Sequence, residues 1–197
     1  MNDALIREHF HRQVLIRHHR SSHSLVVDEL GLRHGKCRAD IAVVNGSLVG
    51  YEIKSDEDSL GRLTDQVDTY SAVFDRAVVV TGPKHKKAVI SALPNWWGII
   101  VCHHGKRGAI RFETWRAAGR NEQVDPVAVA QLLWKIEAVE ILKNLGEPPN
   151  ILRQRRSVLY EKLVDALNLV QLRSKVRECL RRRTNWRHHA PLSLGAG

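Results

Sequence analysis

Asp40, Glu52 and Lys54 carry the side chains in this sequence best suited to chemistry. Alternate side chains of a strand share a face, so a strand through Glu52 and Lys54 projects both to one side and Ile53 to the other. If Asp40 faces Glu52 from a neighbouring strand, the carboxylates repel each other unless a cation lies between them. Oxygen ligands of this kind suit Mg²⁺ or Mn²⁺. The alternative interpretation is a surface salt bridge between Glu52 and Lys54.

The register of one hairpin decides whether the two carboxylates meet. Residues 38–44 and 48–55 read as strands joined at Asn45-Gly46, a strong turn signal. A two-residue turn would place Asp40 opposite Tyr51 and mix polar with apolar side chains on both faces. A three-residue connection with a left-handed Gly46 places Asp40 opposite Glu52. It also gathers one apolar face, formed by Ala39, Ile41, Val43, Val49, Tyr51 and Ile53. Burial therefore predicts the three-residue connection.

The remaining patterns describe an α/β core followed by helices. An amphipathic helix is predicted before the hairpin, over residues 3–19. After the hairpin, the acidic cluster 56–59 is expected to cap a helix that reaches Phe74. The expected elements that follow are a strand at 76–81, a helix at 84–93, strands at 98–102 and 109–115, a helix from 125 to about 145, a linker at 146–150 and a long helix from 157 to 183. This order divides the chain into a core, 1–124, and a helical, basic C-terminal extension, 125–197.

Asp40, followed by Glu52-Ile53-Lys54 on the next strand, resembles the motif of the PD-(D/E)XK nuclease superfamily. Gln66 stands four residues before Tyr70 on the following helix, as in many members, and Glu29 lies where an upstream acid often completes the metal site. The resemblance runs from Glu29 to Tyr70, with Ala39 in place of the usual proline. It implies a restriction-endonuclease-like αβββαβ core with a mixed central sheet, which matches the predicted element order over 3–81.

The resemblance also implies roles for individual residues. Asp40, Glu52, Lys54 and Gln66 would be catalytic, and Mg²⁺ (or Mn²⁺) would be held by Glu29, Asp40, Glu52 and the Ile53 carbonyl. Arg38 and Arg62 are candidate phosphate contacts, although a solvated arginine is the simpler interpretation of each. The implied activity is hydrolysis of phosphodiester bonds in nucleic acid by a metal-dependent nuclease.

The positive charge of the chain is concentrated at its C-terminal end. The net charge is +10, and residues 151–197 hold 11 Lys or Arg against 3 Asp or Glu. Such a surface suits a polyanion, because neutralising phosphates releases their condensed counterions. Arg173, Arg177 and Arg181 recur every four residues and form a stripe predicted to contact nucleic acid, DNA being favoured over RNA. A solvated, solubilising helix face is the alternative.

Composition limits the remaining possibilities. The chain has no apolar run long enough for a membrane span, no apolar N-terminal stretch of the kind a secretion signal has, and three scattered cysteines, so we expect a cytoplasmic protein that does not enter membranes. Two further hypotheses stay open at this point. The chain could be a catalytically inactive nuclease-fold module for DNA binding or assembly, or a regulatory or membrane-surface protein that uses the basic helix. A homodimer would suit an enzyme that cuts two strands.

Overall fold

The computed structural model describes residues 1–105, 109–184 and 186, and its centre is one six-stranded mixed sheet. The strands are β1 (Leu25–Leu32), β2 (Cys37–Val44), β3 (Leu48–Lys54), β4 (Arg76–Thr81), β5 (Gly98–His104) and β6 (Ile110–Arg116). They lie in chain order, with β3, β4 and β5 parallel and the other neighbours antiparallel. The mixed α/β class predicted from the sequence is confirmed.

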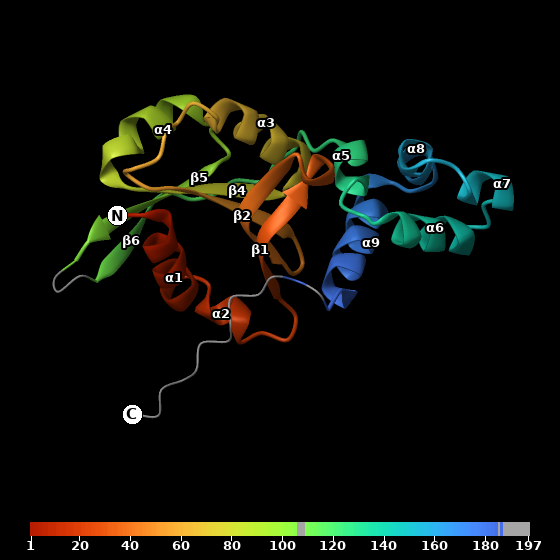
Figure 1. The fold of residues 1–197 in the computed structure, drawn as a ribbon, viewed down its shortest axis with the longest axis horizontal. Coiled ribbons are helices and arrows are strands. Elements are labelled where there is room, and N and C mark those ends of the chain that lie inside the picture. The colour runs from red at the N-terminus through yellow and green to blue at the C-terminus, as the bar shows by residue number, and fades with distance from the viewer. Residues whose placement is uncertain (106–108, 185, 187–197) are drawn as a thin grey trace.

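Helices cover both faces of the sheet (Figure 1). The helix α1 (Asp3–Gln13) and the short α2 (Ile16–His19) lie on one face, and α3 (Leu63–Val73) and α4 (Lys86–Ala92) lie on the other. Beyond the sheet stand the C-terminal helices α5 (Pro126–Ala130), α6 (Lys135–Asn144), α7 (Pro149–Leu152), α8 (Arg156–Ala166) and α9 (Leu169–Arg182). Two short 3-10 turns, Arg33–Gly35 and Pro83–His85, complete the described elements.

Each face of the sheet buries its own apolar cluster. The α1 face gathers Ile6, Phe10, Ile41, Val43 and Ile53 with other side chains of the central strands. The larger cluster, on the opposite face, joins sheet residues to side chains from α3, α5, α6, α8 and α9. The same apolar cluster therefore runs from the predicted core into the predicted extension. The division at residue 124 stays a prediction.

The β2–β3 hairpin has the predicted register. Val44 pairs with Leu48, which leaves three connecting residues, and Ile41 pairs with Tyr51, so that Asp40 is set opposite Glu52. One detail was wrong: Gly46 is not left-handed, because the positive-φ glycines of the described residues are Gly35 and Gly146. Asn45 stabilises the turn instead, through a side-chain oxygen that accepts the Ser47 amide at 2.9 Å.

Several element boundaries differ from the prediction. Strand β1 was missed, and Ala39 packs in the larger cluster rather than beside Ile41. The acidic segment 56–59 does not cap α3, which begins only at Leu63. Each predicted long C-terminal helix is broken in two, at 131–134 and at 167–168. The predicted N-cap Asp125 is confirmed, because its side chain accepts the Val127 amide at 2.9 Å.

Candidate functional site

A polar cleft of about 870 Å³ opens where β2 and β3 meet α1 and α3. Eight of the predicted site residues line it, namely Glu29, Arg38, Asp40, Glu52, Ile53, Lys54, Arg62 and Gln66. The hairpin register and the packing of α3 on the sheet bring these residues together. The predicted contacts Arg173, Arg177 and Arg181 lie on α9 and do not line this cleft.

Glu52 and Lys54 form a buried ion pair in the cleft floor. Lys54 Nζ lies 2.7 Å from Glu52 Oε1, and both residues are buried. The Gln66 amide also donates to Oε1, and the Tyr70 hydroxyl donates to Oε2 at 2.6 Å. Burial, reinforced by the charge of Asp40, raises the pKa of Glu52 to about 7. The predicted interpretation of this pair as an exposed salt bridge is therefore excluded.

Asp40 is held by the backbone of the neighbouring strand and by an arginine from α1. Its Oδ2 accepts the Ile53 amide at 2.7 Å, and its Oδ1 lies 3.0 Å from Arg7 Nη2. Burial raises the pKa of Asp40, against the lowering effect of the Ile53 hydrogen bond and the Arg7 charge. The Asp40 amide donates to the Tyr70 hydroxyl at 3.3 Å, so Tyr70 connects the two carboxylate-bearing strands.

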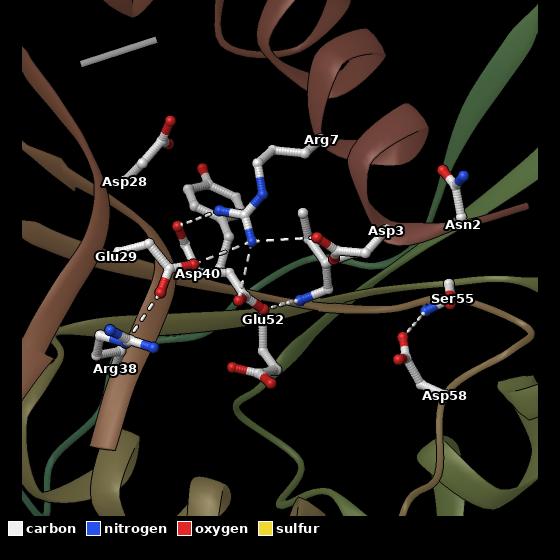
Figure 2. Close-up of polar contacts among 12 residues, drawn as sticks. Asn2, Asp3, Arg7, Asp28, Glu29, Arg38, Asp40, Glu52, Ser55 and Asp58 are labelled. Atoms are coloured by element: carbon white, nitrogen blue, oxygen red, sulfur yellow. Dashed lines mark hydrogen bonds and ion pairs between the residues drawn. The ribbon is translucent and has the colours of Figure 1, made fainter. Parts of the chain in front are cut away.

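Arg7 lies among the carboxylates of Asp3, Glu29 and Asp40, the last two of which were predicted to hold a metal ion (Figure 2). Its Nη2 lies 3.3 Å from Asp3 and from Glu29, and its Nη1 donates to the Asp40 carbonyl at 2.6 Å. These charges raise the pKa of the Arg7 guanidinium although burial opposes them. Sequence reasoning did not select Arg7 and Asp3 as site residues. The available signal was their i,i+4 spacing on the predicted first helix, which places the two side chains on one helix face.

The donor set does not fit Mg²⁺ as it is arranged. The oxygens of Asp40 and Glu52 already accept hydrogen bonds from protein groups, and Arg7 forms ion pairs with Asp3, Glu29 and Asp40. Among the residues that the structure describes, no group of three or more His, Cys, Asp or Glu side chains is placed to hold a metal ion. The predicted Mg²⁺ stays a prediction, and no chemical step is derived through it.

Backbone strain is concentrated at the same cleft. Within the described ranges, the non-glycine residues with positive φ are Glu29 (57°), Arg33 (46°) and His34 (58°). Glu29 and Arg33 line the cleft, and His34 lies in the turn that bounds it. Left-handed backbone costs a non-glycine residue roughly 1–3 kcal/mol and persists where its surroundings hold it in place. Strain and raised carboxyl pKa values at one cleft are typical of functional sites.

Comparison with known proteins assigns the family. The family model of the bacteriophage P4 protein cII matches residues 6–193, nearly the whole chain. The chain belongs to the bacteriophage P4 protein cII family. It is similar to Protein cII of Enterobacteria phage P4, with 27% identity over 125 residues, which make up 64% of this chain and 47% of that protein. The chain thus spans about half the length of this relative. No solved structure matches it.

Membership in the cII family corrects the sequence-based assignment. The resemblance to PD-(D/E)XK nucleases was wrong, because both matches point to protein cII. The nuclease function and its inactive nuclease-fold alternative rested on that resemblance and are withdrawn with it. An Asp, a Glu and a Lys at such loose spacing recur by chance. Here Asp40 is paired with Arg7, and Glu52 accepts hydrogen bonds from Lys54 and from the Tyr70 hydroxyl.

Proposed function

We propose that this cII family chain binds nucleic acid along the rim of the polar cleft, with DNA favoured over RNA. The observation that carries the proposal is the set of cations at the opening. Arg33 and Lys36 come from the β1–β2 turn and Arg62 from the start of α3, and all three are exposed. The structure records no ion pair for any of them among the described residues.

The charges inside the cleft explain why the rim and not the floor would contact phosphate. Glu52 is paired with Lys54, and Arg7 faces Asp3, Glu29 and Asp40, so that when all six groups are ionised the floor holds more negative than positive charge and repels phosphate. Arg38 is less available to phosphate, because it forms an ion pair with Glu29 in which its Nε lies 3.0 Å from a carboxylate oxygen. The rim cations are free to neutralise phosphates and to release condensed counterions, which favours polyanion binding.

The described residues contain no helix with the length and apolar character that crossing a bilayer requires. The order α1, β1–β3, α3, β4 agrees with the αβββαβ core expected from the sequence, and its likeness to the restriction-endonuclease core is a proposal. The predictions of an Mg²⁺-dependent enzyme and of a homodimer stay predictions.

Fluorescence polarisation with a labelled duplex DNA, and with RNA of the same sequence, tests the proposal. We expect tighter binding to DNA, weakened by salt, with a slope that falls by about 2–3 in Arg33→Gln/Lys36→Gln/Arg62→Gln, since each lost phosphate contact removes about 0.9. The control Arg17→Gln/Arg20→Gln/Lys87→Gln removes three exposed charges elsewhere. An equal loss in both variants, or no salt-dependent binding, would refute the cleft as the interface.

A further inference from the structure

A second, smaller cavity lies at the other end of β3 from the polar cleft. It has a volume of about 280 Å³ and includes Ser47, just before β3, whereas the polar cleft includes Lys54 at the end of that strand. The charged residues that line it are Asp75, Arg76, Arg120, Arg173 and Arg177. We call it the arginine pocket. It brings together the start of β4, the loop after β6 and one side of α9.

Two of these arginines are fixed at the inner wall of the arginine pocket. Arg173 Nε lies 3.0 Å from Asp75 Oδ1, and Arg177 Nη1 lies 3.9 Å from Oδ2. Their side chains are only 12% and 18% exposed. Asp75 is fixed as well, because its Oδ2 accepts the Leu48 amide at 2.7 Å. The alternative interpretation of the stripe as a solvated helix face is therefore wrong for Arg173 and Arg177 and fits only the exposed Arg181, and the predicted contact with nucleic acid stays a prediction.

The other two arginines stand at the mouth. Arg76 is exposed and donates from Nη1 to the Ala118 carbonyl at 2.5 Å. Arg120 is exposed, and the structure records no hydrogen bond or ion pair for its side chain among the described residues. Guanidinium groups remain charged at any pH that the fold survives, so four positive charges face one carboxylate in this space. Like charges held together at a partly buried site repel each other unless an anion joins them.

We propose that the arginine pocket binds a phosphate group. The guanidinium fork matches phosphate oxygens with paired, charge-assisted hydrogen bonds. The excess of three positive charges suits a multiply charged oxyanion better than a single carboxylate, and the cavity is large enough to admit a phosphate. The phosphate could belong to a nucleic-acid backbone or to a small phosphate compound. This site does not depend on the polar cleft, since it shares no lining residue with it.

Titration with inorganic phosphate at constant ionic strength tests the site, with the NMR signal of the Arg173 Nε–H group as the readout. We expect a saturable shift of this signal. Arg120→Gln should raise the dissociation constant about tenfold, the usual effect of losing one charge-assisted contact. Because no described residue forms a hydrogen bond or ion pair with the Arg120 side chain, this change should leave the fold intact. The matched control Arg181→Gln removes one exposed charge from α9 outside the pocket and should change the constant less than about twofold.

A second arm of the same experiment identifies the source of the phosphate. If a short duplex DNA gives the same Arg173 shift and competes with inorganic phosphate, the ligand is a phosphodiester backbone. If phosphate shifts the signal and DNA does not, the ligand is a small phosphate compound; either result supports the site. The proposal fails if the Arg173 signal shows no saturable shift, or if Arg120→Gln and Arg181→Gln weaken binding equally, because the effect would then be diffuse charge.

Discussion

Arg7 is the residue that most changes the meaning of the acidic cluster. It brings a fixed positive charge to within 3.3 Å of Asp3, Glu29 and Asp40, and its side chain is only 14% exposed (Figure 2). A carboxylate cluster read from sequence alone invites a metal ion, because the protein cation that satisfies it lies 33 residues away from Asp40. The positive charge beside these carboxylates therefore comes from Arg7, a residue of the same chain, whereas the sequence pattern had suggested a bound metal ion.

Replacing Arg7 by methionine should therefore destabilise the protein. Arg7→Met leaves the partly buried Asp3 and Asp40 without their cation, whereas Glu29 keeps Arg38, so we expect a loss of about 2–4 kcal/mol in the free energy of unfolding, measured in urea at pH 7. Arg12→Met is the matched control. It breaks an exposed i,i+4 pair with Glu8 and should cost less than about 0.5 kcal/mol. Equal losses in the two variants would contradict a special role for Arg7.

Glu52 should titrate near neutral pH. Burial and the nearby Asp40 raise its pKa from 4.5 to about 7, so the folded protein holds this proton more tightly than the unfolded chain does. The stability contributed by this proton is complete below pH 4.5 and is lost as the pH rises through about 7. Carboxyl ¹³C NMR of Glu52, assigned by the loss of its signal in Glu52→Gln, measures the midpoint. A midpoint near 4.5 would contradict the burial of Glu52 beside the charge of Asp40.

At the scale of elements, the hairpin was predictable because apolar burial fixes its register. A slip of one residue would remove Ile41, Val43 and Ile53, which are all buried, from the apolar cluster on the α1 face and turn them to the opposite face. Strand β1 was harder to predict because Glu29 has left-handed backbone and interrupts its pattern. The break before α9 had a readable signal: Asn168 and Gln171 form a capping box, in which each side chain accepts the amide of the other residue.

Strand β3 passes directly beneath Phe74, and this contact requires a glycine. A Cβ on Gly50 would lie 2.6 Å from the Phe74 ring, which is completely buried. Gly50→Ala should lower the free energy of unfolding by roughly 1–3 kcal/mol, because a well-packed core resists an added methyl group. Gly46→Ala in the neighbouring turn meets no atom within 4 Å and should have little effect in the same urea experiment. If Gly50→Ala were neutral, β3 and Phe74 would be less tightly packed than the structure shows.

At the scale of the whole molecule, some of the basic side chains form ion pairs within the protein and others are exposed to solvent. The basic C-terminal end predicted as one nucleic-acid surface divides between different contacts, because Arg183 pairs with Glu137 and Arg173 with Asp75, while Arg181 is exposed. The cations at the polar cleft come instead from the β1–β2 turn and from the start of α3. Net charge could be read from composition, but which charges are free depended on packing between distant elements.

Mapping of DNA contacts by amide NMR is the sharpest test of nucleic-acid binding at the rim of the polar cleft. On addition of a 12-base-pair duplex at physiological salt, we expect saturable shifts in residues 33–38 and 62–66, which border the polar cleft. In the Arg33→Gln/Lys36→Gln/Arg62→Gln protein those shifts should disappear, while the amides of the sheet interior keep their positions. Saturable shifts confined to other surfaces, or a rim variant that binds as the unchanged protein does, would contradict the assignment of the cleft as the nucleic-acid interface.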